Sequence, residues 1–171
     1  MTIPRSIELV EVGPRDGLQN ETARVPAEIK VEFVRRAVAA GLTRIEVASF
    51  VSPRRVPQMA DAEEVLRALP RRPGVRYIGL VLNRAGFDRA AAAGCEEIGM
   101  VVFTTDAFNE RNQGTTSAGS IRTWHEIAAA AQAAGCDMVL VCNDPDAAES
   151  LLDRWMPSPN GELVHRAAKM E

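Results

Sequence analysis

Short apolar runs alternate with alanine-rich helical patterns along most of this chain. Helices that cover both faces of a parallel sheet leave its strands apolar on both sides, so these near-continuous apolar runs predict buried parallel strands. In three segments an alanine-rich helix ends at a glycine and leads, after a short connection, into an apolar strand. These segments span residues 36–47, 89–100 and 130–141.

Strict alternation of strand and helix predicts an α/β fold. A (β/α) barrel and an open doubly wound sheet both fit this alternation, and both place ligands at the carboxyl ends of their strands. With the apolar runs 7–12 and 75–82 included, the pattern predicts about five strands and helices near 27–40, 60–69, 84–93 and 118–134.

Polar side chains recur where the predicted strands end, which suggests that they line one ligand-binding opening at the carboxyl ends of the strands. Helix N-capping after a strand-to-helix turn accounts equally well for some of them. Glu46 is different, because a carboxylate inside an apolar strand needs a partner if it is buried, and Arg15 could supply it. The strand-end residues are Arg15, Asp16, Gln19, Glu46, Ser49, Asn83, Thr104, Thr105, Asp106, Asn143 and Asp144.

Composition narrows the function classes. The 171 residues are 46% hydrophobic, enough for one core and one domain. A net charge of -3 argues against nucleic acid as a partner. No apolar run reaches the roughly 20 residues of a membrane span, so we expect no membrane partner. Three cysteines without CxxC spacing indicate neither disulfides nor a zinc site, and favour a reduced, cytoplasmic compartment.

The segment 12–21 reads Val-Gly-Pro-Arg-Asp-Gly-Leu-Gln-Asn-Glu and concentrates polar chemistry on one strand-to-helix turn. Two glycines and a proline restrict the backbone of this turn. Arg15, Asp16, Gln19 and Asn20 fall within six positions. A buried core has little use for such a cluster, whereas a site for a metal ion and an anionic oxygen would use all of it.

Together with Ile45–Pro53 and Val56–Met59, this segment closely resembles the hydroxymethylglutaryl-CoA lyase family, within the metal-dependent TIM-barrel lyases and Claisen condensing enzymes. The resemblance runs from about residue 7 to about residue 135 and includes Ala107–Asn112. It implies the (β/α)8 TIM-barrel fold, and since a complete barrel takes roughly 250 residues, about five strands in 171 residues predict a partial, incomplete one. It also implies cleavage of a 3-hydroxy-3-methylacyl-CoA into acetyl-CoA and a keto acid, with a divalent cation, Mg²⁺ or Mn²⁺, as cofactor.

The resemblance implies a role for each polar residue at the first two strand ends. Asp16 matches a metal ligand. Arg15 matches the arginine that holds the thioester or keto oxygen as charge develops, which makes it both catalytic and substrate-binding. Glu46 matches a catalytic carboxylate that shapes the site and orients the arginine. Gln19 and Ser49 match substrate-binding residues.

The sequence also departs from the family pattern. Relatives carry a His-x-His pair of metal ligands on a later strand, a later asparagine ligand and a catalytic cysteine in a glycine-rich loop, and this sequence has none of them. Its two histidines, His125 and His165, lie far apart, and Cys95, Cys136 and Cys142 are interpreted as packing residues. The resemblance therefore does not by itself predict activity of this chain alone.

We expect residues 1–145 to form the partial barrel and 146–171 a short helical or poorly ordered tail. The stretch 136–148 resembles the last barrel strand of bacterial exo-β-N-acetylglucosaminidases, without their catalytic residues. Unpaired outer strands predict a homo-oligomer or aggregation. Two alternatives remain open: a condensing enzyme of the isopropylmalate or homocitrate synthase type, and a non-catalytic truncated or fused remnant.

Overall fold

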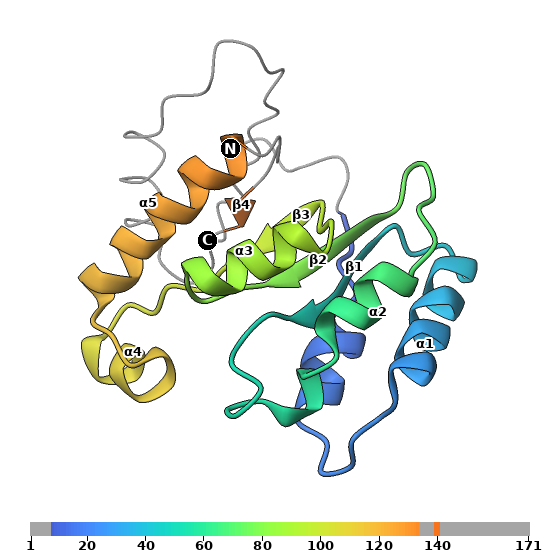
Figure 1. Cartoon of the computed structure of the whole chain (residues 1–171), viewed down its shortest axis with the longest axis horizontal. Helices are drawn as coiled ribbons and strands as arrows, with labels where there is room; N and C mark the ends of the chain where they lie inside the picture. The colour runs from blue at the N-terminus through green and yellow to red at the C-terminus, as the bar shows by residue number, and fades with distance from the viewer. Residues whose placement is uncertain (1–7, 134–138, 141–171) are drawn as a thin grey trace, which may run out of the picture.

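The computed structural model describes residues 8–133 and 139–140. Within them, the predicted α/β organisation is confirmed by one sheet of four parallel strands in the order β1-β2-β3-β4 (Figure 1). Each strand pairs with the next strand along the chain, as expected when helices connect parallel neighbours. The strands are β1 (Arg44–Ser49), β2 (Arg76–Leu80), β3 (Glu97–Gly99) and β4 (Val139–Leu140).

The strand predicted over residues 7–12 is reduced to one parallel bridge between Glu11 and Ile45. The Glu11 N–H donates to Arg44 O at 3.0 Å, and the Glu46 N–H donates to Glu11 O at 2.8 Å. These bonds place the segment beside β1, where the predicted first strand of about five would lie. Its Leu9 side chain is two-thirds exposed, so little burial stabilises a longer ladder.

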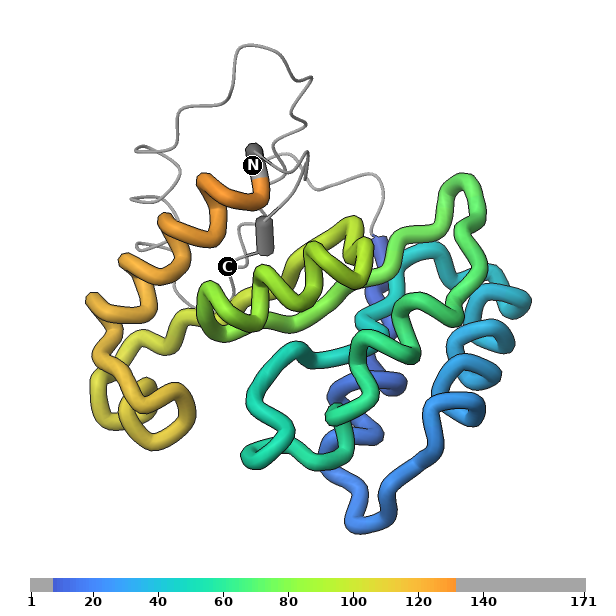
Figure 2. Tube along the Cα trace, viewed as in Figure 1, coloured from blue at the N-terminus to red at the C-terminus, as the bar shows by residue number. Residues whose placement is uncertain are grey.

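All four predicted helices are present, with ends within two residues of the prediction. Figure 2 shows that the four follow one another across the sheet in chain order. A further helix, α4, was not predicted from the sequence. The helices are α1 (Ala27–Ala39), α2 (Ala62–Ala68), α3 (Arg84–Ala92), α4 (Asp106–Gln113) and α5 (Ser117–Ala133), with short helical turns η1 (Gly13–Gly17) and η2 (Pro57–Met59).

The core lies between the sheet and these helices. Every residue of β1 is buried, as the near-continuous apolar pattern predicts for a covered parallel strand. Val34 of α1, Leu66 of α2 and Ile127 of α5 are each at most 2% exposed within one apolar cluster. No helix of the described part is both long and apolar enough to cross a membrane.

Candidate active site

Arg15 lies between two carboxylates at the edge where η1 packs against β1. Its Nε and Nη2 atoms donate to Glu46 Oε2 at 2.9 and 2.6 Å. Its Nη1 atom donates to Asp16 Oδ1 at 2.7 Å. The partner proposed for Glu46 from the sequence is therefore the one that the structure provides. Since Glu46 Oε2 accepts two hydrogen bonds from one guanidinium, the carboxylate both balances the charge of Arg15 and holds the guanidinium in one orientation.

Glu46 is 7% exposed, and burial is the main reason that its pKa is raised above the ordinary value. The Arg15 charge and hydrogen bonds oppose this rise, and the nearby negative charge of Asp16 adds slightly to it. A carboxyl with a raised pKa releases its proton less readily than it would in water. Glu46 therefore combines a buried, perturbed carboxyl with two hydrogen bonds that orient Arg15.

The turn η1 is held in place by its own backbone. The N–H groups of Arg15 and Asp16 both donate to Val12 O, at 3.1 and 2.7 Å. The Glu11 carboxylate accepts the N–H of Gly13 at 2.6 Å. Sequence reasoning missed this role of Glu11, although its place directly before the motif was visible. The turn therefore presents Arg15 and Asp16 on a rigid support.

Asn20 contributes to this support rather than to an open site. Its Nδ2 atom donates to Asp16 O at 2.8 Å, so the side chain closes the end of the turn. The sequence groups Asn20 with the candidate site, and the structure gives it a local structural partner. Asn83 likewise caps α3, because its Oδ1 atom accepts the N–H of Gly86 at 2.9 Å. N-capping accounts for this strand-end residue.

Gln19 and Ser49 carry buried polar atoms that have no hydrogen-bond partner among residues 8–133 and 139–140. The atoms are Gln19 Oε1 and Ser49 Oγ, and the Ser49 residue is fully buried. Neither side chain is hydrogen-bonded to Arg15, Asp16 or Glu46. Most buried polar atoms in proteins are paired, so these two atoms, like Trp124 Nε1 of α5, have hydrogen-bonding capacity that the described residues do not use.

Asp16 has the chemistry of a ligand for a hard divalent cation, and its side chain is 54% exposed. However, the described part of the chain brings together no group of three or more His, Cys, Asp or Glu side chains that could hold a metal ion. These residues therefore supply one carboxylate and do not make a complete metal site. Cys95 is buried and donates to Glu97 O at 3.2 Å, in keeping with its predicted packing role.

Comparison with known proteins identifies related chains. The HMGL-like family model matches residues 6–151. The human cytoplasmic 3-hydroxy-3-methylglutaryl-CoA lyase is 45% identical over 130 residues, covering 76% of this chain and 35% of that protein. The chain spans about two fifths of the length of the curated relatives it matches.

Two solved structures share the fold. The HMG-CoA lyase of Bacillus subtilis superposes with a TM-score of 0.81 at 28% identity, covering 90% of this chain and 56% of that one. An HMG-CoA lyase of Acinetobacter baumannii, in complex with coenzyme A and 3-methylmalate, gives 0.78 at 31% identity and covers 90% and 54%. Apart from Val139 and Leu140, the stretch 136–148 lies outside the described residues, so its resemblance to glucosaminidases stays a prediction.

Proposed function

This chain belongs to the HMGL-like family, and on that premise we propose that it is a hydroxymethylglutaryl-CoA lyase-like protein. The proposed reaction is cleavage of a 3-hydroxy-3-methylacyl-CoA into acetyl-CoA and a keto acid. The observation that carries the proposal is the Arg15 guanidinium, held between Asp16 and Glu46 at the edge of a parallel sheet. The proposed architecture is part of a (β/α)8 TIM barrel, in which this edge is the catalytic face.

The reaction removes the proton of the tertiary hydroxyl and breaks a C–C bond, which yields the keto acid and leaves the electron pair on the thioester enolate. The enolate then takes up one proton at carbon to give acetyl-CoA. In the proposal, Arg15 stabilises the negative charge that develops on the enolate oxygen of the thioester. Glu46 keeps the guanidinium oriented, and burial raises the pKa of its carboxyl above the ordinary value. The unpartnered Gln19 Oε1 and Ser49 Oγ atoms would bind polar groups of the substrate.

A divalent cation, Mg²⁺ or Mn²⁺, would supply Lewis-acid polarisation of the substrate's oxygens. Asp16 would be one of its ligands, and the others would come from outside the described residues or from another chain. We further propose self-association, because apolar side chains are exposed close to the first sheet edge, and a cytoplasmic location like that of the human relative. The exposed apolar residues of this region, which spans the segment before η1 and the helix α1, are Leu9, Val12, Ile29 and Phe33.

Calorimetric titration of the chain with Mn²⁺ tests the metal ligand. Asp16→Ala should abolish binding, whereas Asp88→Ala should not. Asp88 is a matched control, because it is similarly exposed and also pairs with a neighbouring arginine at 2.8 Å. Equal binding by both variants, or no binding by the unaltered chain, would contradict a metal site built on Asp16.

An activity assay then tests the reaction. Acetyl-CoA release from the hydroxyacyl-CoA without added keto acid supports the lyase. Turnover only in the opposite direction, from acetyl-CoA and a keto-acid acceptor, would instead indicate a condensing enzyme of the isopropylmalate or homocitrate synthase type. No turnover and no metal binding would indicate a non-catalytic remnant.

A further inference from the structure

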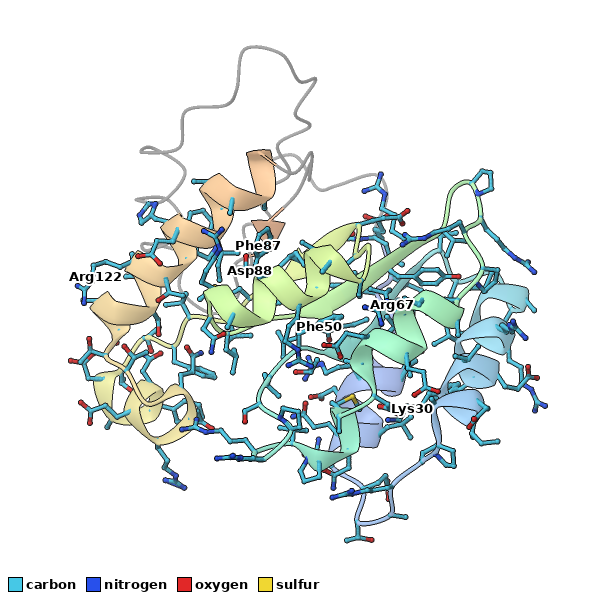
Figure 3. All side chains as sticks on the ribbon, viewed as in Figure 1. Lys30, Phe50, Arg67, Phe87, Asp88 and Arg122 are labelled. Atoms are coloured by element: carbon cyan, nitrogen blue, oxygen red, sulfur yellow. The ribbon has the colours of Figure 1, made fainter. Side chains whose placement is uncertain are left out.

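Lys30 is a charged side chain that the fold encloses almost completely. It lies on the face of α1 that packs toward α2, and only 2% of the residue is exposed. Its Nζ atom donates to Gln58 O at 2.5 Å and to Asp61 Oδ1 at 2.6 Å. Figure 3 labels Lys30 where α1 faces the segment that leads into α2. Burying an ammonium group is unfavourable unless its partners are well placed, so this geometry is tightly specified.

The two acceptors of Lys30 belong to the connection between β1 and α2. Asp61 stands at the N-cap position of α2, yet its side chain makes no capping bond to that helix. Its carboxylate pairs with Lys30 instead. An aspartate at this position would ordinarily cap its own helix. Here a long-range ion pair with Lys30 replaces that local capping bond.

Gln58 extends the contact to the first candidate site segment. Its Nε2 atom donates to Glu21 O at 2.8 Å. Glu21 follows Gln19 by two residues, and the connection that carries Gln58 begins directly after Ser49. The Lys30 latch, defined as Lys30, Gln58, Asp61 and Glu21, therefore ties the stretch that follows Gln19 to the connection that follows Ser49.

We propose that Lys30 is a positioning residue that sets the separation between the stretch directly after Gln19 and the connection directly after Ser49. This inference rests on the proposed function, in which both residues bind the substrate. Lys30 touches neither of them and acts through Gln58 and Asp61. Packing alone does not require an ion pair here, because apolar side chains of similar volume can replace both partners of a buried ion pair with little loss of stability.

Hydrogen exchange measured by mass spectrometry on the full chain tests the latch. Lys30→Met should speed amide exchange by roughly tenfold or more in both segments 17–22 and 51–61, the effect expected on losing a hydrogen bond to a charged group. Arg36→Met is the matched control on the same helix, since Arg36 is exposed and forms a surface ion pair with Glu32 at 2.8 Å. It should leave both segments unchanged.

Gln58→Leu provides a second variant if Lys30→Met does not fold. It keeps the backbone acceptor of Lys30 but removes the bond to Glu21, so exchange should rise in segment 17–22 alone. Unchanged exchange in that segment, or in either segment of Lys30→Met, would overturn the latch.

Calorimetric binding of the hydroxyacyl-CoA separates positioning from stability. Lys30→Met should weaken binding about tenfold relative to Arg36→Met, measured in conditions where circular dichroism shows both variants to be fully folded, because removing one partner of a buried pair also lowers stability. Faster exchange with undiminished binding would overturn the positioning role. If the unaltered chain does not bind this compound, the proposed function fails, and the exchange data still decide whether the latch exists.

Discussion

Replacing Arg15 with methionine should expose how strongly the candidate site depends on one cation. The change removes both bonds to Glu46 Oε2 and the bond to Asp16 Oδ1. Methionine fills a similar volume and is compatible with a helical turn. The variant therefore tests the charge and the hydrogen bonds of Arg15 rather than the packing around it.

The expected loss of stability in Arg15→Met follows from how deeply the ion pair is buried. The side chains of Arg15 and Glu46 are 14% and 9% exposed, so removing the cation leaves a nearly buried carboxylate without its partner. Breaking such a pair typically lowers the free energy of unfolding by about 3–5 kcal/mol. The lost contact with Asp16, which is more than half exposed, adds only about 0–1 kcal/mol.

The loss should depend on pH in a definite direction. The pKa of Glu46 is already raised by burial, and removing the opposing charge of Arg15 raises it further. A carboxyl whose pKa is higher in the folded state gives stability that is complete below the unfolded pKa of about 4.3 and lost as pH rises through the folded pKa. The deficit of Arg15→Met should therefore be smallest near pH 4 and largest at neutral pH.

Urea unfolding followed by circular dichroism between pH 4 and pH 8 measures this deficit. Adding Glu46→Gln to Arg15→Met removes the unpaired charge and should restore about 2 kcal/mol or more at neutral pH. Arg84→Met, which removes an exposed pair with Asp88, is the control and should change stability by less than about 1 kcal/mol. Equal stability of the single and double variants at pH 7 would refute the dependence of Glu46 on Arg15.

Two further predictions concern the support around β1. Gly86→Ala should lower the unfolding free energy by about 1–3 kcal/mol in urea titrations, because a Cβ there would lie 2.7 Å from Phe50 O; Gly17→Ala, where a Cβ meets nothing within 4 Å, should be tolerated. Arg89→Met should lower stability by about 1 kcal/mol at neutral pH and progressively less in acid. The hydrogen bond from Arg89 lowers the pKa of Glu63, so its stabilisation exists above the unfolded pKa and disappears as pH falls through the folded pKa; a constant deficit across this range would contradict that origin.

The helix-to-strand pattern could be predicted because local residues determine it. Gly41 and Gly94 follow α1 and α3 with φ of 97° and 79°, the left-handed conformation that the sequence pattern indicates for a helix-ending glycine. The helix α4 could not be predicted from hydrophobic periodicity, because its only buried residue is Asn109. That side chain donates to the backbone oxygens of Phe103 and Thr105 instead of packing in an apolar stripe.

The pairing of Arg15 with Glu46 could also be predicted, because a carboxylate in a buried strand requires a cation nearby. The Lys30 contacts could not. Lys30 lies among helical positions that give no sign of its partners, and its acceptors are 28 and 31 residues away along the chain. One acceptor is a backbone oxygen, which no residue type identifies. Tertiary packing, rather than local sequence pattern, determines the contacts of Lys30.

The two carboxylates that bind Arg15 contribute unequally to stability, because one is exposed and the other is buried. This difference determines which of them can exchange Arg15 for a ligand. Asp16 is exposed and accepts a single hydrogen bond from Arg15. If Asp16 binds a cation instead, the loss of this ion pair costs only about 0–1 kcal/mol. Glu46 is buried and accepts two bonds, so the guanidinium keeps its orientation when Asp16 leaves. The Nη1 atom is then free to donate to an anionic oxygen. In the proposed function, therefore, the exposed Asp16 is the carboxylate that a cation can take up, and the buried Glu46 is the one that keeps the arginine oriented.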